Sequence, residues 1–363
     1  MDTMTNSPAL LSLATSVPPY RFRQDEVVAW ARGFFEQRFP DFDRMAPAFA
    51  NAGIETRHSC VPLDWYDQPH DWPERTRLYV EQSLALLERA TIACLEQAGR
   101  TIDDVDAVVM VSSTGIATPT LDARLAQRLR MRRDLERLPI FGLGCAGGTL
   151  GLARAATLAR AKPGTRVLFL VVELCGLTFR ADDVSKSNVI AAALFGDGAA
   201  AALIEADADG MPARSAARPT LGPSGDYTWP DSLDIMGWEV MHNGLGVLFS
   251  RDIPSLVRDQ LAGALDAFLE RHALNRHALD GFIVHPGGAK VLAALEDAFA
   301  LPAGGLDDAR AVLRDYGNMS AATVLFVLRR ALDRGARGLQ LLSALGPGFT
   351  AGFQLLDMGA GRA

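Results

Sequence analysis

Runs of apolar residues alternate with helical repeats along this 363-residue chain. Two runs, 105–113 and 166–174, are apolar at nearly every position, which is typical of strands in a sheet covered on both faces. Elsewhere apolar residues recur every three to four positions, and this spacing predicts amphipathic helices. The predicted helices cover 24–39, 76–98, 121–129, 254–268, 290–299 and 321–334, and shorter strands are predicted at 9–14, 281–285, 338–344 and 349–356.

Other stretches have a different character. Residues 238–249 alternate between apolar and polar positions like a pair of strands. Residues 62–73 are rich in proline and aromatic side chains, and we expect them to form a covering loop rather than a helix. Residues 41–53 show no regular period, and 54–58 fit a loop or an edge strand.

The order of these elements indicates an α/β fold in two similar halves. Polar, proline-rich residues 208–230 are the best candidate for a boundary, so we expect an N-terminal half at 1–210 and a C-terminal half at 211–363. In each half a strand leads into a turn with glycine, and a buried helix follows. This shared pattern predicts a duplicated α/β unit with sheets rich in parallel strands.

A single cysteine marks the most unusual of these turns, in Phe141–Leu150 (FGLGCAGGTL). The pattern predicts the end of a buried strand, a tight turn and the first turn of a buried helix. Cys145 would then lie near unpaired N–H groups and the positive end of the helix dipole, which both favour a thiolate. A buried, inert thiol is an equally good interpretation of this stretch alone.

Four more polar residues lie at strand ends, in turns or within apolar runs. His285 ends the run Gly281–His285, and by itself it fits a hydrogen-bonded core histidine. Asn318 fits a helix cap, Asp197 a turn residue and Glu173 a partner for a nearby turn. Together, a cysteine, a histidine and an asparagine near strand tips would meet if the halves pack face to face. Histidine could stabilise a thiolate, and histidine and asparagine could donate to an oxyanion.

Composition and charge exclude several classes of function. The net charge is −7, which argues against a surface for nucleic acid or anionic membrane. The four cysteines show neither a paired framework nor the spacing of a zinc site, and the histidines show no metal-ligand spacing. No stretch has the form of a signal peptide or reaches the length of a membrane span. We therefore expect a soluble, cytoplasmic protein without a metal.

Motifs in both halves resemble the thiolase superfamily, and specifically the chalcone synthase-like, or type III polyketide synthase, family. The resemblance extends over nearly the whole chain. It depends on GCAGGTLGLARA around Cys145, VELCGLTFR (172–180), ALFGDGAAAALI (193–204), GLGVLFSRDIP (244–254), FIVHPGGAKVL (282–292), DYGNMSAATVLFVL (315–328) and SALGPGFTAG (343–352). VSSTGIATP, FGLGCAGG, VELC and MGWEV look more like a bacterial branch that makes alkylpyrones and alkylresorcinols from fatty acyl-CoAs.

The resemblance implies a fold, a reaction and a set of substrates. The fold would be the thiolase fold, a duplicated αβαβα layered architecture. Malonyl-CoA would be added to an acyl-CoA starter by iterative decarboxylative Claisen condensation, without an additional cofactor. Cys145 would carry the acyl group, while His285 and Asn318 would hold the malonyl thioester carbonyl. The protein is expected to be a homodimer.

The resemblance also implies binding residues around that centre. Phe195 matches the gatekeeper phenylalanine between the CoA tunnel and the cavity, whereas Val247 replaces a second aromatic gatekeeper and would widen the passage. Thr118 would reach across the dimer into the partner's cavity. Arg44 and Lys290 would bind CoA at the mouth of its tunnel. Further cavity positions match Ser113, Cys175, Thr178, Ser320, Gly346, Pro347 and Gly348.

Two other functions fit parts of the same pattern. A condensing enzyme like β-ketoacyl synthase III would share the three catalytic residues but would perform one extension on an acyl carrier protein. Such a carrier is acidic and needs a basic docking patch, and the sequence shows no obvious basic cluster. A catalytically inactive scaffold subunit would have no need for intact Cys145, His285 and Asn318.

Overall fold

The structure is a computed structural model that describes residues 7–36, 42–207, 218–302 and 304–359. Its main feature is a nine-stranded sheet in the order β11-β12-β13-β8-β1-β7-β6-β4-β5. The N-terminal half supplies β1 (Ala9–Ser16), β4 (Ala107–Val111), β5 (Glu136–Ile140), β6 (Arg166–Leu174) and β7 (Asp197–Glu205), and the C-terminal half supplies β8 (Thr220–Thr228), β11 (Gly281–Val284), β12 (Leu339–Gly346) and β13 (Thr350–Asp357). The two sets of strands meet between β1 and β8, where Ala9 pairs with Thr220.

Strand directions in this sheet are mixed. Strand β4 runs parallel to β5 and β6, and β11 runs parallel to β12. Strand β7 is antiparallel to both β1 and β6, and β13 is antiparallel to both β8 and β12. The prediction of sheets rich in parallel strands is therefore wrong. Apolar runs alone do not reveal direction, because any strand covered on both faces is apolar throughout.

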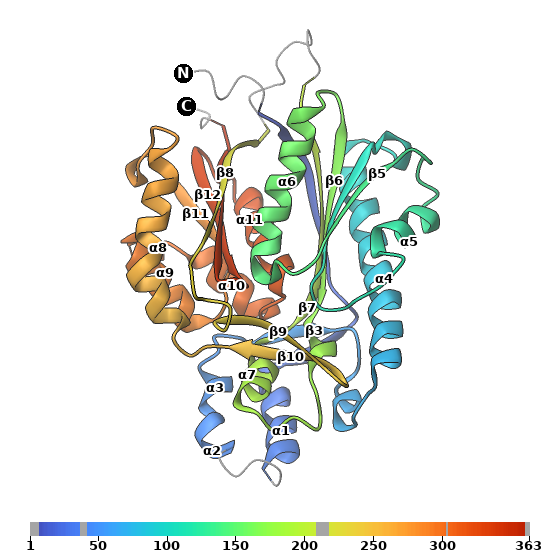
Figure 1. The fold of residues 1–363 in the computed structure, drawn as a ribbon, viewed down its shortest axis with the longest axis vertical. Coiled ribbons are helices and arrows are strands. Elements are labelled where there is room, and N and C mark those ends of the chain that lie inside the picture. The colour runs from blue at the N-terminus through green and yellow to red at the C-terminus, as the bar shows by residue number, and fades with distance from the viewer. Residues whose placement is uncertain (1–6, 37–41, 208–217, 303, 360–363) are drawn as a thin grey trace.

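Helices divide the molecule into five layers (Figure 1). Helices α6 (Gly147–Ala161) and α11 (Thr323–Asp333) lie in the middle and contact strands of both halves. Helices α4 (Trp72–Ala98) and α5 (Leu121–Arg128) cover the N-terminal strands, while α8 (Ile253–Glu270) and α9 (Ala289–Phe299) form the opposite outer layer. Helix α10 (Asp307–Tyr316) packs against α11. This arrangement confirms the predicted αβαβα thiolase fold.

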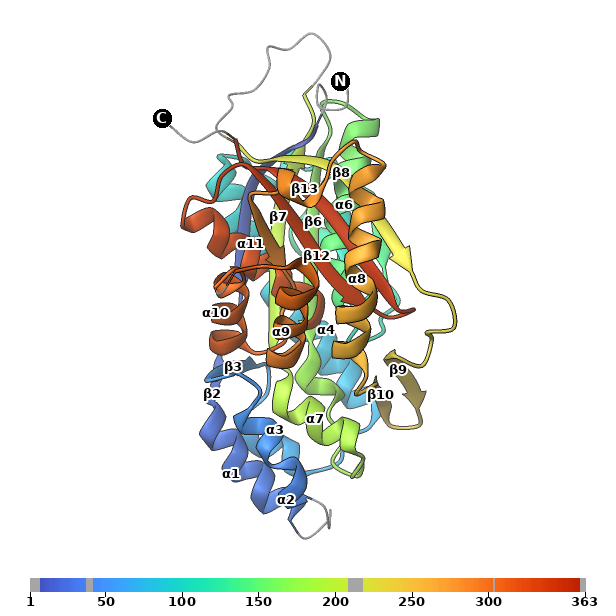
Figure 2. The same ribbon diagram turned by 90° about the vertical axis from the view of Figure 1, so that its left-hand side faces the viewer.

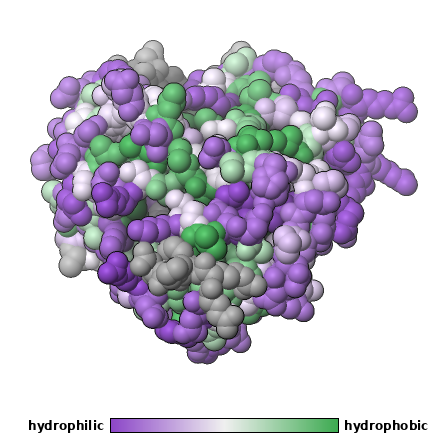
Figure 3. All heavy atoms as spheres, turned by 60° about the horizontal axis from the view of Figure 1, so that its bottom comes forward, coloured by the Kyte–Doolittle hydropathy of each residue, from purple (hydrophilic) through white to green (hydrophobic). Residues whose placement is uncertain are grey.

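Smaller elements gather at one end of the layers, at the bottom in Figures 1 and 2. They comprise the helices α1 (Gln24–Phe35), α2 (Phe42–Met45), α3 (Pro47–Ala50) and α7 (Lys186–Leu194), and the strand pair β2 (Tyr20–Arg23) and β3 (Thr56–Ser59). A second ribbon, β9 (Met236–Met241) paired with β10 (Gly244–Phe249), confirms the strand pair predicted at 238–249. Figure 3 looks towards this end and shows apolar patches among polar side chains.

Several boundaries differ from the prediction. Helix α4 begins inside the predicted covering loop, because the Asp71 side chain accepts a hydrogen bond from the N–H of Glu74 and caps the helix before Pro73. Strand β8 lies within the region interpreted as a boundary. The predicted division at 210/211 itself falls outside the described residues, as does the end of the helix predicted at 24–39.

Candidate active site

Cys145 lies in a 3-10 turn, Gly144–Ala146, that leads directly into the N-terminus of α6. The turn is buried, but the strand before it is not. Strand β5 is the edge of the sheet, and in this chain four of its five residues are exposed. The prediction of a buried strand before Cys145 is therefore wrong, and Pro139 fits the edge position because it has no N–H to donate.

A chain of contacts connects the cysteine to the predicted asparagine and histidine. The Cys145 Sγ lies 3.6 Å from the Ser320 Oγ. The backbone N–H of Ser320 donates to the Asn318 Oδ1 at 2.8 Å, and the Asn318 Nδ2 donates to the Gly287 carbonyl at 3.3 Å. Gly287 in turn donates its N–H to the His285 carbonyl. Residues separated by up to 175 positions are thus brought together.

The structural element that holds Asn318 differs from the one predicted. It lies in a turn between α10 and the 3-10 turn Ser320–Ala322, not at the tip of a strand. Its backbone forms an isolated parallel bridge with Phe195. Ser320 has a φ of +46°, a strained conformation for a residue with a side chain, and such strain often marks functional sites.

His285 is the clearest sign of a binding site. The residue is buried, and neither ring nitrogen has a hydrogen-bond partner within the part of the chain that the structure describes. A buried polar group without a hydrogen-bond partner lowers the stability of the fold, so such a group often marks a place where a ligand binds. The Asn318 Nδ2 has a second hydrogen that Gly287 does not use. Both side chains therefore have donors available for an incoming carbonyl oxygen.

Burial determines the protonation of this pair in the absence of substrate. Burial, together with the nearby Glu173 carboxylate, raises the pKa of Cys145 to about 12. Burial also lowers the pKa of His285 to about 3. Burial thus opposes the thiolate that the helix N-terminus favours. Before substrate binds, burial therefore favours the uncharged form of both groups, a thiol and an imidazole.

The loop Gly346–Gly348 packs directly against the cysteine turn. The ring of Pro347 lies so close to Gly144 that a Cβ built there would be 2.5 Å from the Pro347 Cδ. Gly346 lies against the Leu143 carbonyl and Ala146. These loop residues thus hold the backbone on either side of Cys145, in addition to any contact with substrate.

We expect Gly144→Ala to reduce both stability and activity. The new methyl group would overlap Pro347, and Gly144 also has a φ of +48°. Gly142→Ala is a matched control, since its φ is +91° but nothing lies within 4 Å of its Cβ position. Melting temperatures and turnover should fall more for Gly144→Ala. Equal losses in the two variants would show that backbone strain alone explains the effect.

Ser113 and Glu173 form a buried network behind the cysteine turn. The Ser113 hydroxyl accepts from the Gly144 N–H at 3.2 Å. The Ser113 N–H and the Thr114 hydroxyl donate to the Glu173 Oε2 at 3.0 and 2.8 Å. Burial raises the pKa of Glu173 to about 7 despite these donors. Ser113 therefore braces the backbone of Gly144.

The raised pKa of Glu173 predicts a pH-dependent stability. Between about pH 4.5 and 7 the folded state holds a proton on Glu173 that the unfolded state has released, so stability falls as pH rises through this range. The Glu173→Gln variant has no carboxyl proton to release in this range. Its melting temperature relative to the wild type should rise over this range, by an equivalent of about 1–3 kcal/mol. A difference that is independent of pH would contradict the assignment.

Phe195 and Val247 lie in one apolar cluster with Cys175 and Ala191. Phe195 follows α7, and its ring contacts Trp238 and Phe249 of the β9–β10 ribbon. The predicted gatekeeper and the position that departs from the family pattern are thus neighbours. Cys175 and Thr178 lie in a 3-10 turn after β6, where the Thr178 hydroxyl donates to the Cys175 carbonyl at 2.7 Å.

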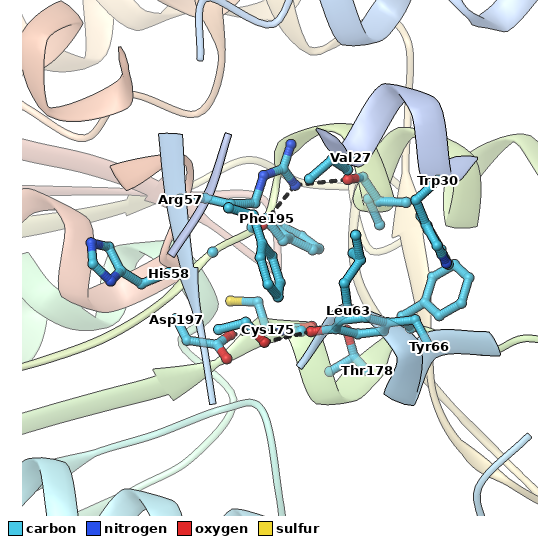
Figure 4. A pocket seen from close by; sticks show the side chains of 17 residues that line it. Val27, Trp30, Arg57, His58, Leu63, Tyr66, Cys175, Thr178, Phe195 and Asp197 are labelled. Atoms are coloured by element: carbon cyan, nitrogen blue, oxygen red, sulfur yellow. Dashed lines mark hydrogen bonds between the residues drawn. The ribbon is translucent and has the colours of Figure 1, made fainter. Parts of the chain in front are cut away.

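A cavity of about 50 Å³ lies behind Phe195. Cys175, Thr178 and Phe195 line it on one side, and Trp30 and Leu63 are among the apolar side chains on the other. Figure 4 shows the Phe195 ring in this space between Arg57 and Cys175. Cys145, His285 and Asn318 do not line it, so this cavity adjoins the catalytic centre without being part of it.

Arg57 is a site residue that the sequence did not reveal. Its buried guanidinium donates to the carbonyls of Ala192, Ala193 and Phe195 at 2.7, 2.6 and 2.9 Å, and also to Gln24. Burial lowers its pKa to about 10, which still leaves it charged at neutral pH. A cation here satisfies the last carbonyls of α7 and fixes the backbone of Phe195. All these partners except Gln24 lie more than 130 residues away, so no local pattern indicates them.

The remaining predicted residues are exposed. Thr118 is exposed on the loop between β4 and α5. Arg44 is exposed on α2, and Lys290 is exposed in the first turn of α9. In the described ranges, no group of three His, Cys, Asp or Glu side chains is placed to hold a metal ion. Across the same residues, none of the helices is both long and apolar enough to cross a bilayer.

Comparisons with known proteins agree with this geometry. The sequence models described as "Chalcone and stilbene synthases, N-terminal domain" and "C-terminal domain" match residues 70–208 and 225–358. A 1,3,6,8-tetrahydroxynaphthalene synthase of Streptomyces peucetius subsp. caesius is 38% identical, covering 96% of this chain and 92% of that protein. A phloroglucinol synthase of Pseudomonas fluorescens is 29% identical, covering 92% and 94%.

Solved structures show the same fold over the whole length. The 1,3,6,8-tetrahydroxynaphthalene synthase of Streptomyces coelicolor A3(2), a bacterial type III polyketide synthase, matches with a TM-score of 0.88 at 28% identity. The match covers 97% of this chain and 100% of that chain. The chain therefore belongs to the chalcone and stilbene synthase family and is an acyl-transferring enzyme, a type III polyketide synthase.

Proposed function

We propose that this synthase extends a medium- or long-chain fatty acyl-CoA with malonyl-CoA and closes the product to an alkylpyrone or an alkylresorcinol. The main support for this reaction is His285, which is buried and whose ring nitrogens have no hydrogen-bond partner among the described residues. The contacts that connect Asn318 to Cys145 through Ser320 add to this support. The CoA thioesters are the substrates, and no additional cofactor takes part.

Each of the three residues has a distinct role in this proposal. The Cys145 thiol transfers its proton to His285 as its sulfur attacks the acyl-CoA carbonyl. The carbon–sulfur bond to CoA then breaks, the departing CoA sulfur takes the proton from His285, and the acyl group remains on Cys145 as a thioester. His285 and Asn318 then donate to the malonyl-CoA carbonyl oxygen while the carbon–carbon bond to CO₂ breaks. The resulting enolate carbon attacks the acyl carbonyl, a new carbon–carbon bond forms, and the Cys145 sulfur leaves as a thiolate.

The apolar surroundings of Phe195 support a fatty starter. Val247 gives the passage an aliphatic wall, and the cavity beyond Cys175 and Thr178 is lined largely by apolar side chains. An alkyl chain gains free energy by leaving water for such a surface, whereas a polar starter would have few partners. Arg44 and Lys290 are proposed to bind the CoA phosphates at the mouth.

A second candidate is the synthesis of a polyhydroxylated arene. The relative from S. peucetius is named a 1,3,6,8-tetrahydroxynaphthalene synthase. Such a product has no alkyl chain, so it requires no fatty starter. Under this alternative, malonyl-CoA alone would be both starter and extender.

A product screen by mass spectrometry distinguishes these functions. Purified enzyme would receive malonyl-CoA alone and with acetyl-, hexanoyl-, lauroyl-, palmitoyl- or p-coumaroyl-CoA. Pyrones or resorcinols from the longer acyl-CoAs support the proposal, whereas an arene from malonyl-CoA alone supports the second candidate. Products that form only with an acyl carrier protein would contradict both.

We also propose a cytoplasmic homodimer in which Thr118 of one protomer reaches the cavity of the other. Three large apolar side chains are exposed near the free edge strand β5, namely Ile116, Leu138 and Phe141. Covering them would remove apolar surface from water and pair an open sheet edge. The catalytic cysteine belongs to the proposed N-terminal half, 1–210, and the histidine and asparagine to the proposed C-terminal half, 211–363.

A further inference from the structure

The turn that carries Asn318 is held from both sides. The Asn318 N–H donates to the Leu194 carbonyl at 2.9 Å, and its own carbonyl accepts from the Gly196 N–H at 3.0 Å. The side chain is fixed as well, because its Oδ1 accepts from the Ser320 N–H and its Nδ2 donates to the Gly287 carbonyl. The amide cannot rotate without losing these hydrogen bonds. The position of the N–H that Gly287 does not use therefore depends on where the turn itself lies.

This turn follows the end of α10, which lies next to β3 (Figure 2). The last carbonyls of a helix have no partner within the helix. Here the Glu55 N–H donates to the Arg314 carbonyl at 2.8 Å. The Thr56 hydroxyl donates to the Asp315 carbonyl at 2.7 Å. Strand β3 and the residue before it thus cap the helix just before the catalytic turn.

Tyr316 connects this support to the turn. Its ring is stacked on the His58 ring of β3, with centroids 6.0 Å apart, and it meets the Phe326 ring of α11 edge-on at 5.0 Å. His58 is itself held, because its Nδ1 lies 3.1 Å from the Pro18 carbonyl, which can only accept a hydrogen bond. Ring pairs at such distances attract each other beyond the area that they bury. Tyr316 is thus clamped between a strand of the N-terminal half and a helix of the C-terminal half.

Only Gly317 separates the clamped ring from Asn318. Gly317 has a φ of +70°, a region that favours glycine. A Cβ built on it would lie 3.0 Å from the Leu194 carbonyl oxygen, so the backbone packs closely against the end of α7. A displacement of Tyr316 would therefore reach Asn318 across a single residue.

We propose that Tyr316 is a positioning residue for the reaction, because its clamped ring fixes the turn on which Asn318 presents its remaining N–H to the malonyl carbonyl. The inference rests on the proposed function for the role of Asn318. Oxyanion donors act only at the correct distance, and a displacement of about 1 Å can reduce a rate about a hundredfold. Tyr316 should thus affect the loss of CO₂, but neither the binding of malonyl-CoA nor the reactivity of Cys145.

The test follows the conversion of malonyl-CoA to acetyl-CoA and CO₂ by liquid chromatography, with kcat and KM determined separately. Tyr316→Ala should lower kcat by about tenfold or more, while KM changes little. Tyr316→Phe keeps the ring and should stay close to the wild type. A second readout is the rate at which iodoacetamide alkylates Cys145. This rate requires no starter, and it should be the same in Tyr316→Ala and the wild type.

His58→Ala removes one side of the clamp and should cause a smaller loss of the same kind. Tyr20→Ala is the control, since Tyr20 is an exposed tyrosine opposite Ser59 in the β2–β3 ribbon. A folded Tyr316→Ala variant with the kcat of the wild type, or with an equal fall in alkylation, would overturn the inference. If that variant does not fold, an unchanged kcat in His58→Ala overturns it. A wild type that does not decarboxylate malonyl-CoA contradicts the proposed function itself, and the inference with it.

Discussion

Cys145→Ala should abolish condensation, with a loss of product on the order of a thousandfold or more. No other described side chain on the contact chain to His285 carries a thiol, so the acyl group has no alternative carrier. The variant should nevertheless continue to convert malonyl-CoA to acetyl-CoA, because His285 and Asn318 remain to hold the thioester carbonyl during the loss of CO₂.

Two measurements make this expectation specific. Intact-protein mass spectrometry should detect an acyl adduct on the wild type and none on Cys145→Ala. Cys94→Ala is a matched control, because Cys94 is also a buried thiol but contacts Ser12 on β1, far from the catalytic turn. An adduct that persists in Cys145→Ala, or one that disappears in Cys94→Ala, would contradict the assignment of the nucleophile.

Arg57→Leu should cause the largest loss of stability among the variants considered, about 3 kcal/mol or more. The substitution removes the donors of three buried carbonyls at the end of α7, and leucine offers none in return. The loss should appear as a lower midpoint in urea unfolding. Any folded fraction should also show altered starter selectivity, because the backbone of Phe195 loses its restraint.

The matched control is Arg21→Leu, on the strand that pairs with the one carrying Arg57. Arg21 lies opposite His58 in this ribbon and is exposed, so its replacement should change stability little. Arg57→Lys keeps a positive charge but loses the planar guanidinium. Its midpoint of urea unfolding should lie between those of the wild type and Arg57→Leu. If Arg57→Leu unfolds at the same midpoint as Arg21→Leu, the guanidinium does not hold α7.

The proposed catalytic residues could be selected from the sequence because each lies in a local motif. Cys145 and His285 follow strands and precede helices, and this arrangement is visible in apolar runs with glycines. Asn318 was identified by its motif, but its position between two helices was not, because the bridge to Phe195 joins segments more than 120 residues apart. The protonation of Cys145 could not be decided from the sequence, which shows the helix that follows but not the depth of burial.

Other features depend on tertiary structure in ways that a sequence hides. Strand directions were mispredicted because a strand covered on both faces has the same apolar pattern in either direction. Arg57 gave no signal, since its partners are backbone carbonyls of a distant helix.

The central layer of α6 and α11 also determines how this protein can unfold. Helix α6 contacts β4, β6 and β7 on one side and β8, β12 and β13 on the other. A half of the chain expressed alone would therefore present one apolar face of this layer to water, which promotes aggregation. The two halves should melt as one cooperative unit, and separately expressed fragments should gain solubility only when they are produced together.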